Sequence, residues 1–148
     1  GKGMASGLPV GAFTSSKEIM ETLSENPKMG HITTFGGNPV IAASSLATLQ
    51  VLLKTSLIED TLKKEVLFKE LLKHQKIKEI RGKGLMLALI MDSAETANEL
   101  VLRAKEDKLI LFWLLFENKA VRISPPLTIS NAEIRKGCTT ILKVLNSL

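Results

Sequence analysis

The sequence is poor in several residue types whose abundance would point to a particular class of protein. Cys138 is the only cysteine, tyrosine is absent, and aromatic residues make up 4% of the 148 positions. A single cysteine excludes a disulfide within the chain and is typical of a reducing compartment, so we expect a cytoplasmic protein. The longest apolar run, Leu109 to Phe116, is far too short to cross a membrane, and we expect no membrane partner. We also expect no metal ion.

Positive charge is in excess but is not concentrated in one stretch. The net charge is +5 and the isoelectric point is about 9.4. A surface that binds nucleic acid typically combines clustered basic residues with aromatic residues. Here lysine and arginine are spread along the predicted helices beside glutamate and aspartate, with few aromatic residues among them. We therefore expect no nucleic-acid partner.

The pattern of apolar residues predicts an α/β fold. Hydrophobic residues make up 45% of the chain, enough for a core, and stretches with helical periodicity alternate with short strand-like runs. We expect a small α/β domain with a mostly antiparallel sheet and flanking helices. The stretch 40–45 is apolar or small nearly all round, which predicts burial on more than one side. The predicted strands cover 8–13, 77–81, 85–91, 109–112 and 120–124, and the predicted helices cover 15–23, 39–54, 56–74, 94–105 and 130–146.

Three helix starts have the spacing of a capping box, in which serine and glutamate stand three residues apart and satisfy each other's backbone N–H groups. The pairs are Ser15 with Glu18, Ser56 with Glu59, and Ser130 with Glu133.

The first residues contain a lone lysine, Lys2, among small residues, with glycines at positions 3, 7 and 11. Glycines let the backbone turn sharply and approach another group closely. An amine that traps a carbonyl must be neutral to attack, and an apolar or cationic setting lowers the pKa of a lysine. Lys2 is thus a candidate nucleophile, and the alternative is a solvated lysine in a flexible glycine loop.

Two further segments are candidates for anion binding. In Thr33-Thr34-Phe35-Gly36-Gly37-Asn38-Pro39, hydroxyls and glycines precede a predicted helix start, where N–H groups and the helix dipole favour phosphate. The pattern is weak alone, because many capped glycine loops bind nothing. Arg122 lies on a predicted strand before two prolines, and its planar guanidinium can grip a carboxylate through two parallel hydrogen bonds. The alternative for Arg122 is a surface ion pair.

Four motifs in order give the chain a family resemblance. Lys-Gly-Met-x-x-Gly-Leu-Pro-x-Gly-Ala from Lys2 resembles the cofactor-lysine segment of the class III aminotransferases, the acetylornithine and ornithine aminotransferase group. These are pyridoxal-phosphate enzymes of fold type I. The other three motifs of the resemblance are Thr33 to Pro39, Arg81-Gly82-Lys83-Gly84-Leu85-Met86, and Val121-Arg122-Ile123-Ser124-Pro125-Pro126-Leu127.

The resemblance assigns a role to three residues. It implies that Lys2 is the catalytic residue and forms the internal aldimine with pyridoxal 5'-phosphate. Thr34 would touch the cofactor phosphate of the neighbouring subunit, so that a homodimer shares its active sites. Arg122 would bind the α-carboxylate of the substrate. Arg81 has no such role and is expected to brace its turn.

The resemblance also implies a domain division and a reaction. Residues 1–38 would be a remnant of the large cofactor-binding domain, 39–55 a connecting helix, and 56–148 the C-terminal small domain of a longer enzyme. The implied reaction moves an amino group from an ω-amino donor such as N-acetylornithine to 2-oxoglutarate, in arginine biosynthesis. The 4-aminobutyrate and ornithine δ-aminotransferases and a glutamate-semialdehyde aminomutase remain open. The alternative from another class is a non-catalytic module for dimerisation or interaction, and the isolated chain is expected to be inactive.

Overall fold

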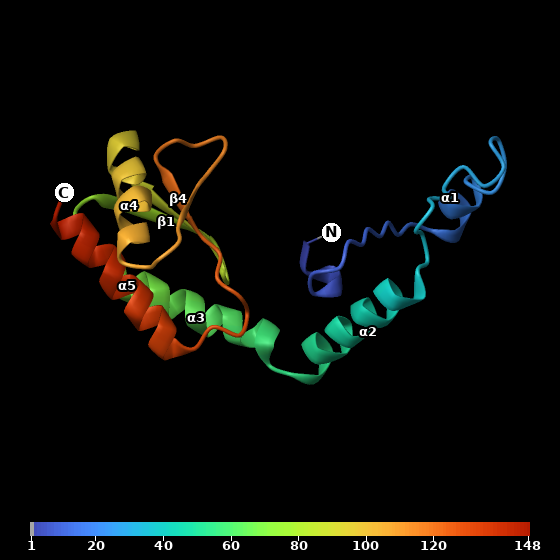
Figure 1. The fold of residues 1–148 in the computed structure, drawn as a ribbon, viewed down its shortest axis with the longest axis horizontal. Helices are drawn as coiled ribbons and strands as arrows, with labels where there is room; N and C mark the ends of the chain where they lie inside the picture. The colour runs from blue at the N-terminus through green and yellow to red at the C-terminus, as the bar shows by residue number, and fades with distance from the viewer. Residues whose placement is uncertain (1) are drawn as a thin grey trace. The chain divides into compact units, whose positions relative to one another are not determined.

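The computed structural model describes residues 2–148, apart from the side chain of Lys2. The chain divides into two compact units, Gly1–Thr55 and Ser56–Leu148 (Figure 1). No single helix among the described residues is both long and apolar enough to cross a membrane, although the two helices Pro39–Lys54 and Leu57–Leu71 would together pass on length and composition.

The described part of the first unit contains three helical elements. They are the 3-10 turn η1 (Lys2–Ala5), the helix α1 (Lys17–Glu21) and the longer helix α2 (Pro39–Lys54). Asn38 caps α2 through its side-chain oxygen, which accepts the N–H groups of Val40 and Ile41, and proline fills the first helical position. The predicted start and end of this helix are confirmed.

Three predictions for the first unit are wrong. Residues 8–13 form no strand, because residues 2–55, as the structure describes them, contain no second strand to pair with them. Ser16 and not Ser15 caps α1, by accepting the N–H of Ile19. The helix α2 has no buried residue in the described structure, so the burial predicted for 40–45 is not found within this unit.

The second unit is an antiparallel sheet covered by helices. Its four strands lie in the order β1-β2-β4-β3, and all three pairings are antiparallel, which confirms the predicted fold class. The strands are β1 (Ile77–Lys83), β2 (Met86–Met91), β3 (Phe112–Trp113) and β4 (Ala120–Ile123), and the helices are α3 (Leu57–Leu71), α4 (Ala94–Glu106) and α5 (Asn131–Asn146).

The three helices lie on one face of this sheet. The helix α4 contacts β2, β3 and β4, α3 contacts β1, and α5 packs against both α3 and α4 (Figure 1). The core therefore lies between the helices and the sheet residues that face them, including Leu87, Leu89, Val121 and Ile123. Burying one such side chain stabilises the fold by roughly 1.5–3 kcal/mol. Residues that alternate with these, such as Arg81, Ala88 and Arg122, lie on the opposite face.

The β1–β2 hairpin requires a glycine at the end of β1 and another in the turn itself. Gly82 has a φ of +115°, and a Cβ there would lie 2.0 Å from the carbonyl oxygen of Met86. Gly84 has a φ of +60°, and its N–H donates to the carboxylate of Glu65 on α3. This contact and the ammonium of Lys69 hold the pKa of Glu65 below its usual range, with the lysine the larger cause. The motif 81–86 thus fixes the hairpin against α3, while Arg81 pairs with Glu79 on its own strand.

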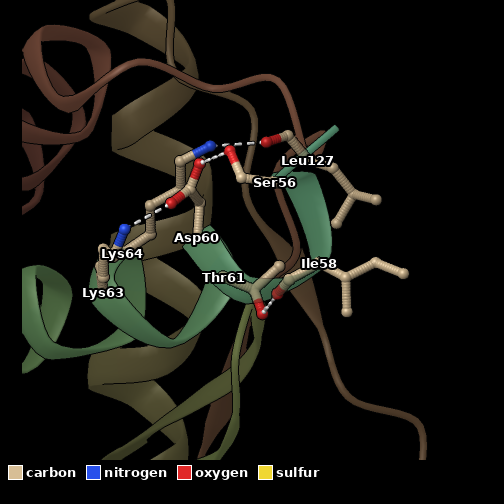
Figure 2. A network of polar contacts seen from close by, with 7 residues as sticks. All are labelled: Ser56, Ile58, Asp60, Thr61, Lys63, Lys64 and Leu127. Carbon is tan, nitrogen blue, oxygen red and sulfur yellow. Dashed lines mark hydrogen bonds and ion pairs between the residues drawn. The ribbon is translucent and has the colours of Figure 1, made fainter. Parts of the chain in front are cut away.

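The start of α3 differs from the predicted capping box. Ser56 is the N-cap residue, but its side chain accepts no backbone N–H; its hydroxyl instead donates to Asp60, at 2.7 Å (Figure 2). Lys63 donates to the other oxygen of Asp60 at 2.8 Å, and the hydrogen bonds from Lys63 and Ser56 lower the pKa of Asp60. In contrast, α5 begins with the complete predicted box, in which Ser130 and Glu133 satisfy each other.

Candidate functional site

The turn that carries Lys2 is held against the middle of α2. Ala5 at its end is fully buried, and its carbonyl oxygen accepts the hydroxyl of Ser44 at 2.8 Å. The hydroxyls of Ser6 and Thr48, one helical turn further along α2, are also 2.8 Å apart. The backbone next to Lys2 is therefore fixed at a defined place on the helix. The side chain of Lys2 lies outside the described part of the structure.

Thr34 lies in the loop that precedes α2. Its side chain is exposed, and its hydroxyl has no hydrogen-bond partner among residues 2–148. The N–H groups of Val40 and Ile41 are already occupied by Asn38, so the helix end itself does not offer them to an anion. Phosphate binding by the loop 33–38 stays a prediction, and two of the N–H groups at the helix end do not take part in it. The hydroxyl of Thr34 remains available.

A small pocket lies where the two N-terminal motifs meet. It has a volume of about 240 Å³ and lies within the first unit. Residues 9–11, which end the lysine motif, form one wall, and the loop before α2 forms the other. Thr33 and Phe35 line it, on either side of Thr34 in the sequence. The lysine and threonine motifs thus come together in one unit, although the turn of Lys2 and the loop of Thr34 contact different parts of α2.

Arg122 lies in the second unit, at the centre of β4. Its neighbours Val121 and Ile123 are buried in the core, and Arg122 itself is exposed on the face of the sheet that no helix of this unit covers. Its guanidinium has no ion pair and donates no hydrogen bond within residues 2–148. Arg81 and Arg103, in contrast, are paired with Glu79 and Glu99. The surface ion pair considered for Arg122 is therefore not found in the described structure.

The segment after Arg122 is held by one hydrogen bond from α3 and one within the segment, and it leads directly into α5. Lys64 on α3 donates to the carbonyl oxygen of Leu127 at 2.6 Å (Figure 2). The N–H of Ile129 donates to the carbonyl oxygen of Pro126, and Ser130 then begins α5. Hydrogen bonds from Ser130 hold the pKa of Glu133 below its ordinary value. The end of β4 is thereby fixed between two helices, which limits how far Arg122 can shift.

Phe112 is the contact of Arg122 that the sequence did not reveal. The Cζ atom of Arg122 lies over the ring of Phe112, 5.0 Å from its centroid. The prediction placed a core strand at 109–112, but β3 begins at Phe112 and this side chain is 54% exposed. Only the register of β3 against β4 brings the two residues together, and that register cannot be read from spacing.

Comparisons with known proteins indicate the same family as the four motifs. The sequence model of the family described as aminotransferase class-III matches residues 1–145. The chain is 35% identical to the acetylornithine aminotransferase of Caldanaerobacter subterraneus over 152 residues, covering 99% of the chain and 37% of that protein. It is 34% identical to the putrescine aminotransferase of Pectobacterium atrosepticum, covering 94% of the chain and 31% of that protein.

Solved structures show the same relationship. The ornithine aminotransferase of Toxoplasma gondii superposes with a TM-score of 0.76 at 31% identity, covering 88% of this chain and 31% of that one. The acetylornithine aminotransferase of Elizabethkingia anophelis superposes with a TM-score of 0.70 at 31% identity, covering 80% and 32%.

The chain belongs to the class III aminotransferases. It spans about a third of the length of the curated relatives that it matches.

Proposed function

We propose that this chain is the C-terminal portion of a pyridoxal-phosphate-dependent aminotransferase. The amino group would pass from an ω-amino donor resembling N-acetylornithine to 2-oxoglutarate. The observation that carries the proposal is the family match over residues 1–145, a range that includes Lys2, Thr34 and Arg122. The acetylornithine, ornithine and putrescine aminotransferases among the relatives support the choice of donor class.

The proposed domain division follows from the same match. Residues 1–38 belong to the large cofactor-binding domain, 39–55 form the connecting helix, and 56–148 form the small domain. The remainder of the cofactor site is expected in the part of the enzyme that the relatives have and this chain does not cover. The dependence on the cofactor is supported by one solved relative, the ornithine aminotransferase of Toxoplasma gondii, which was described with partial occupancy of PLP at its active site.

The described residues fit such a cofactor. Thr34 offers an exposed hydroxyl without a partner among residues 2–148, suited to a phosphate oxygen. Arg122 offers a guanidinium edge without a partner in the same range, suited to a carboxylate. When bound, the cofactor supplies an aldehyde that an amine can condense with and a ring that accepts electron density from the substrate.

Each residue then has a distinct task. The amine of Lys2 would hold the cofactor and move a proton at the substrate carbon that bears the transferred amino group, for which it must be neutral. Arg122 binds the α-carboxylate and so fixes the orientation of the bond that loses its proton. Thr34 binds the phosphate of the cofactor in the neighbouring subunit, which makes the homodimer the working unit. Attachment of the Lys2 turn and the Thr34 loop to different parts of α2 supports tasks in two different active sites.

The first experiment tests Lys2 in the intact protein that carries this sequence. Its mass is measured first, to establish how far it extends beyond residues 1–148. Pyridoxal phosphate is then added, the protein is reduced with borohydride, and its peptides are mapped. We expect a pyridoxyl group on Lys2, its loss in Lys2→Ala, and its retention in Lys17→Ala. A folded, intact protein without this modification would overturn the proposal in favour of a non-catalytic interaction module.

The second experiment tests Arg122 by steady-state kinetics. Arg122→Lys keeps the charge but can make only one of the two parallel hydrogen bonds, and the lost bond to a charged group is worth about 1.5–3 kcal/mol. We expect kcat/KM to fall about 10- to 150-fold while the absorbance of the bound cofactor is kept. Arg135→Lys, at an exposed position of α5, is the matched control and should leave kcat/KM unchanged. Equal kinetics in both variants would remove the carboxylate role from Arg122.

A further inference from the structure

Phe112 and Arg122 stand directly opposite each other in the sheet. In the antiparallel register of β3 and β4, Phe112 pairs with Arg122, and Trp113 pairs with Val121. Residues directly opposite each other project from the same face, with Cβ atoms about 4.5–5.5 Å apart. Val121 is fully buried in the core, so Phe112 and Arg122 share the opposite face.

The other neighbour of Arg122 is too small to hold it. On β2, Ala88 pairs with Arg122, and on β1, Arg81 pairs with Ala88. These pairings give one row across all four strands, in which the alanine separates the two arginines. Since neighbouring strands are about 4.8 Å apart, Arg81 lies about 10 Å from Arg122 along the row. A methyl group on one side and an aromatic ring on the other leave Phe112 as the larger contact surface for the guanidinium.

The stacking geometry leaves the hydrogen-bonding edge of Arg122 accessible. The Cζ atom lies 5.0 Å from the centroid of the Phe112 ring and over it, so the guanidinium rests against the ring. The five N–H groups lie in the plane of the guanidinium and point away along its edges. Among residues 2–148 no acceptor occupies them. Arg81 and Arg103 differ in this respect, since each is held edge-on by a carboxylate.

The geometry points to Phe112 as a positioning residue for Arg122: its ring holds the guanidinium in place so that N–H groups without a partner are presented to a substrate carboxylate. This inference rests on the proposed carboxylate role of Arg122. A cation over an aromatic ring at an exposed site gains about 0.5–1 kcal/mol, equivalent to a two- to fivefold change in an equilibrium constant. The stack thus limits the rotamers of a long, mobile side chain before the substrate arrives, which favours binding.

The stack itself is tested on the 148-residue chain by NMR. The chain has four arginines (Arg81, Arg103, Arg122 and Arg135), so their side-chain signals can be assigned individually. A ring current shifts protons above a ring upfield, and we expect the Arg122 side-chain protons to show this shift. The shift should disappear in Phe112→Leu and persist in Phe112→Tyr. Phe116→Leu makes the same change at a fully exposed ring and should leave it unaltered. An Arg122 signal that is the same in the original chain and in Phe112→Leu would overturn the inference.

The consequence for substrate binding is tested in the intact enzyme. Phe112→Leu should raise KM for the carboxylate substrates about two- to fivefold with kcat unchanged, because it removes binding made equally in the ground and transition states. Phe112→Tyr should restore KM, and Phe116→Leu should not change it. In an Arg122→Lys background, the effect of Phe112→Leu should shrink, since the pair acts as a unit.

The two ideas fail in different ways. If Arg122→Lys leaves the kinetics unchanged, the proposed carboxylate role fails, whatever the NMR signals of the stack show. If Arg122→Lys has its large effect but Phe112→Leu has none, or acts equally in both backgrounds, only the positioning role of Phe112 fails.

Discussion

Replacing Gly82 with alanine tests whether the β1–β2 turn has the backbone described above. The residue has a φ of +115°, a conformation that residues with a Cβ rarely adopt. An added Cβ would lie 2.0 Å from the carbonyl oxygen of Met86 and 3.0 Å from the Cα of Leu87. Both atoms are backbone, so the clash cannot be relieved by rotating a side chain. The hairpin itself must open or shift.

The cost can be worked from these two effects. A strained backbone conformation of this kind costs about 1–3 kcal/mol. Shifting the hairpin loses one or two of the hydrogen bonds next to the turn, at about 1 kcal/mol each. The sum is about 2–5 kcal/mol, a large share of the roughly 5–15 kcal/mol that stabilise a typical domain. For a domain of 60–100 residues, 1 kcal/mol corresponds to about 4–8 °C in Tm, so a fall of at least 8 °C is expected.

Thermal and urea unfolding of the 148-residue chain measure this fall. Trp113 is the only tryptophan and lies in the second unit, so its fluorescence reports on the unit that contains Gly82. Gly11→Ala is the control, since nothing lies within 4 Å of its added Cβ and its φ is not positive. A Gly82→Ala variant that unfolds within about 2 °C of the original chain would refute the reasoning, because neither the strain nor the clash could then exist.

Three further outcomes are expected. Gly137→Ala should stabilise the second unit by about 0.5–1 kcal/mol in urea unfolding, because glycine weakens a helix interior and the new methyl group would lie 3.9 Å from Leu109; a loss of stability would contradict the space seen there. The pKa of Glu133 is lowered mainly by the backbone N–H of Ser130, so its contribution to the free energy of unfolding is present above about pH 4.5 and is lost as the pH falls through the folded pKa. Glu133→Gln should therefore reduce the loss of stability on acidification, and an unchanged dependence of stability on pH would disprove the coupling. Cys138 is buried and its pKa is raised to about 11, so a thiol reagent should modify it only at the rate of unfolding; rapid modification of the native chain would contradict this.

The sequence predicted those elements whose signals are local. Asn38 and Pro39 mark the start of α2, and Ser130 with Glu133 marks that of α5, because capping depends on residues within one turn. The hairpin around Gly82 was predicted for the same reason. Ser56 shows the limit of such local reasoning, because its hydroxyl donates to Asp60 instead of forming the capping box with Glu59. Spacing alone does not decide between these two neighbouring carboxylates.

Features that depend on distant pairing were not predicted. The strand expected at 8–13 has the right composition, but a strand forms only where another strand satisfies its backbone groups. The stack of Phe112 on Arg122 depends on the register of an edge strand only two residues long. The candidate site likewise combines residues that local motifs revealed with a feature that only the fold reveals. Lys2, Thr34 and Arg122 were found from motifs, whereas the absence of a partner for Arg122 among residues 2–148 required the fold.

The first unit contains almost no interior of its own. Ala5 is its only buried residue among those described, while Phe13, Ile32, Phe35 and Leu53 are each at least 63% exposed. Segments with so little apolar burial open and close with free energies near zero. Hydrogen exchange should therefore be fast at most amides of 2–55 in the isolated chain and slow in the sheet and helices of 56–148. For residues 2–55 we therefore expect folding to be coupled to burial against apolar surface that this unit does not itself contain.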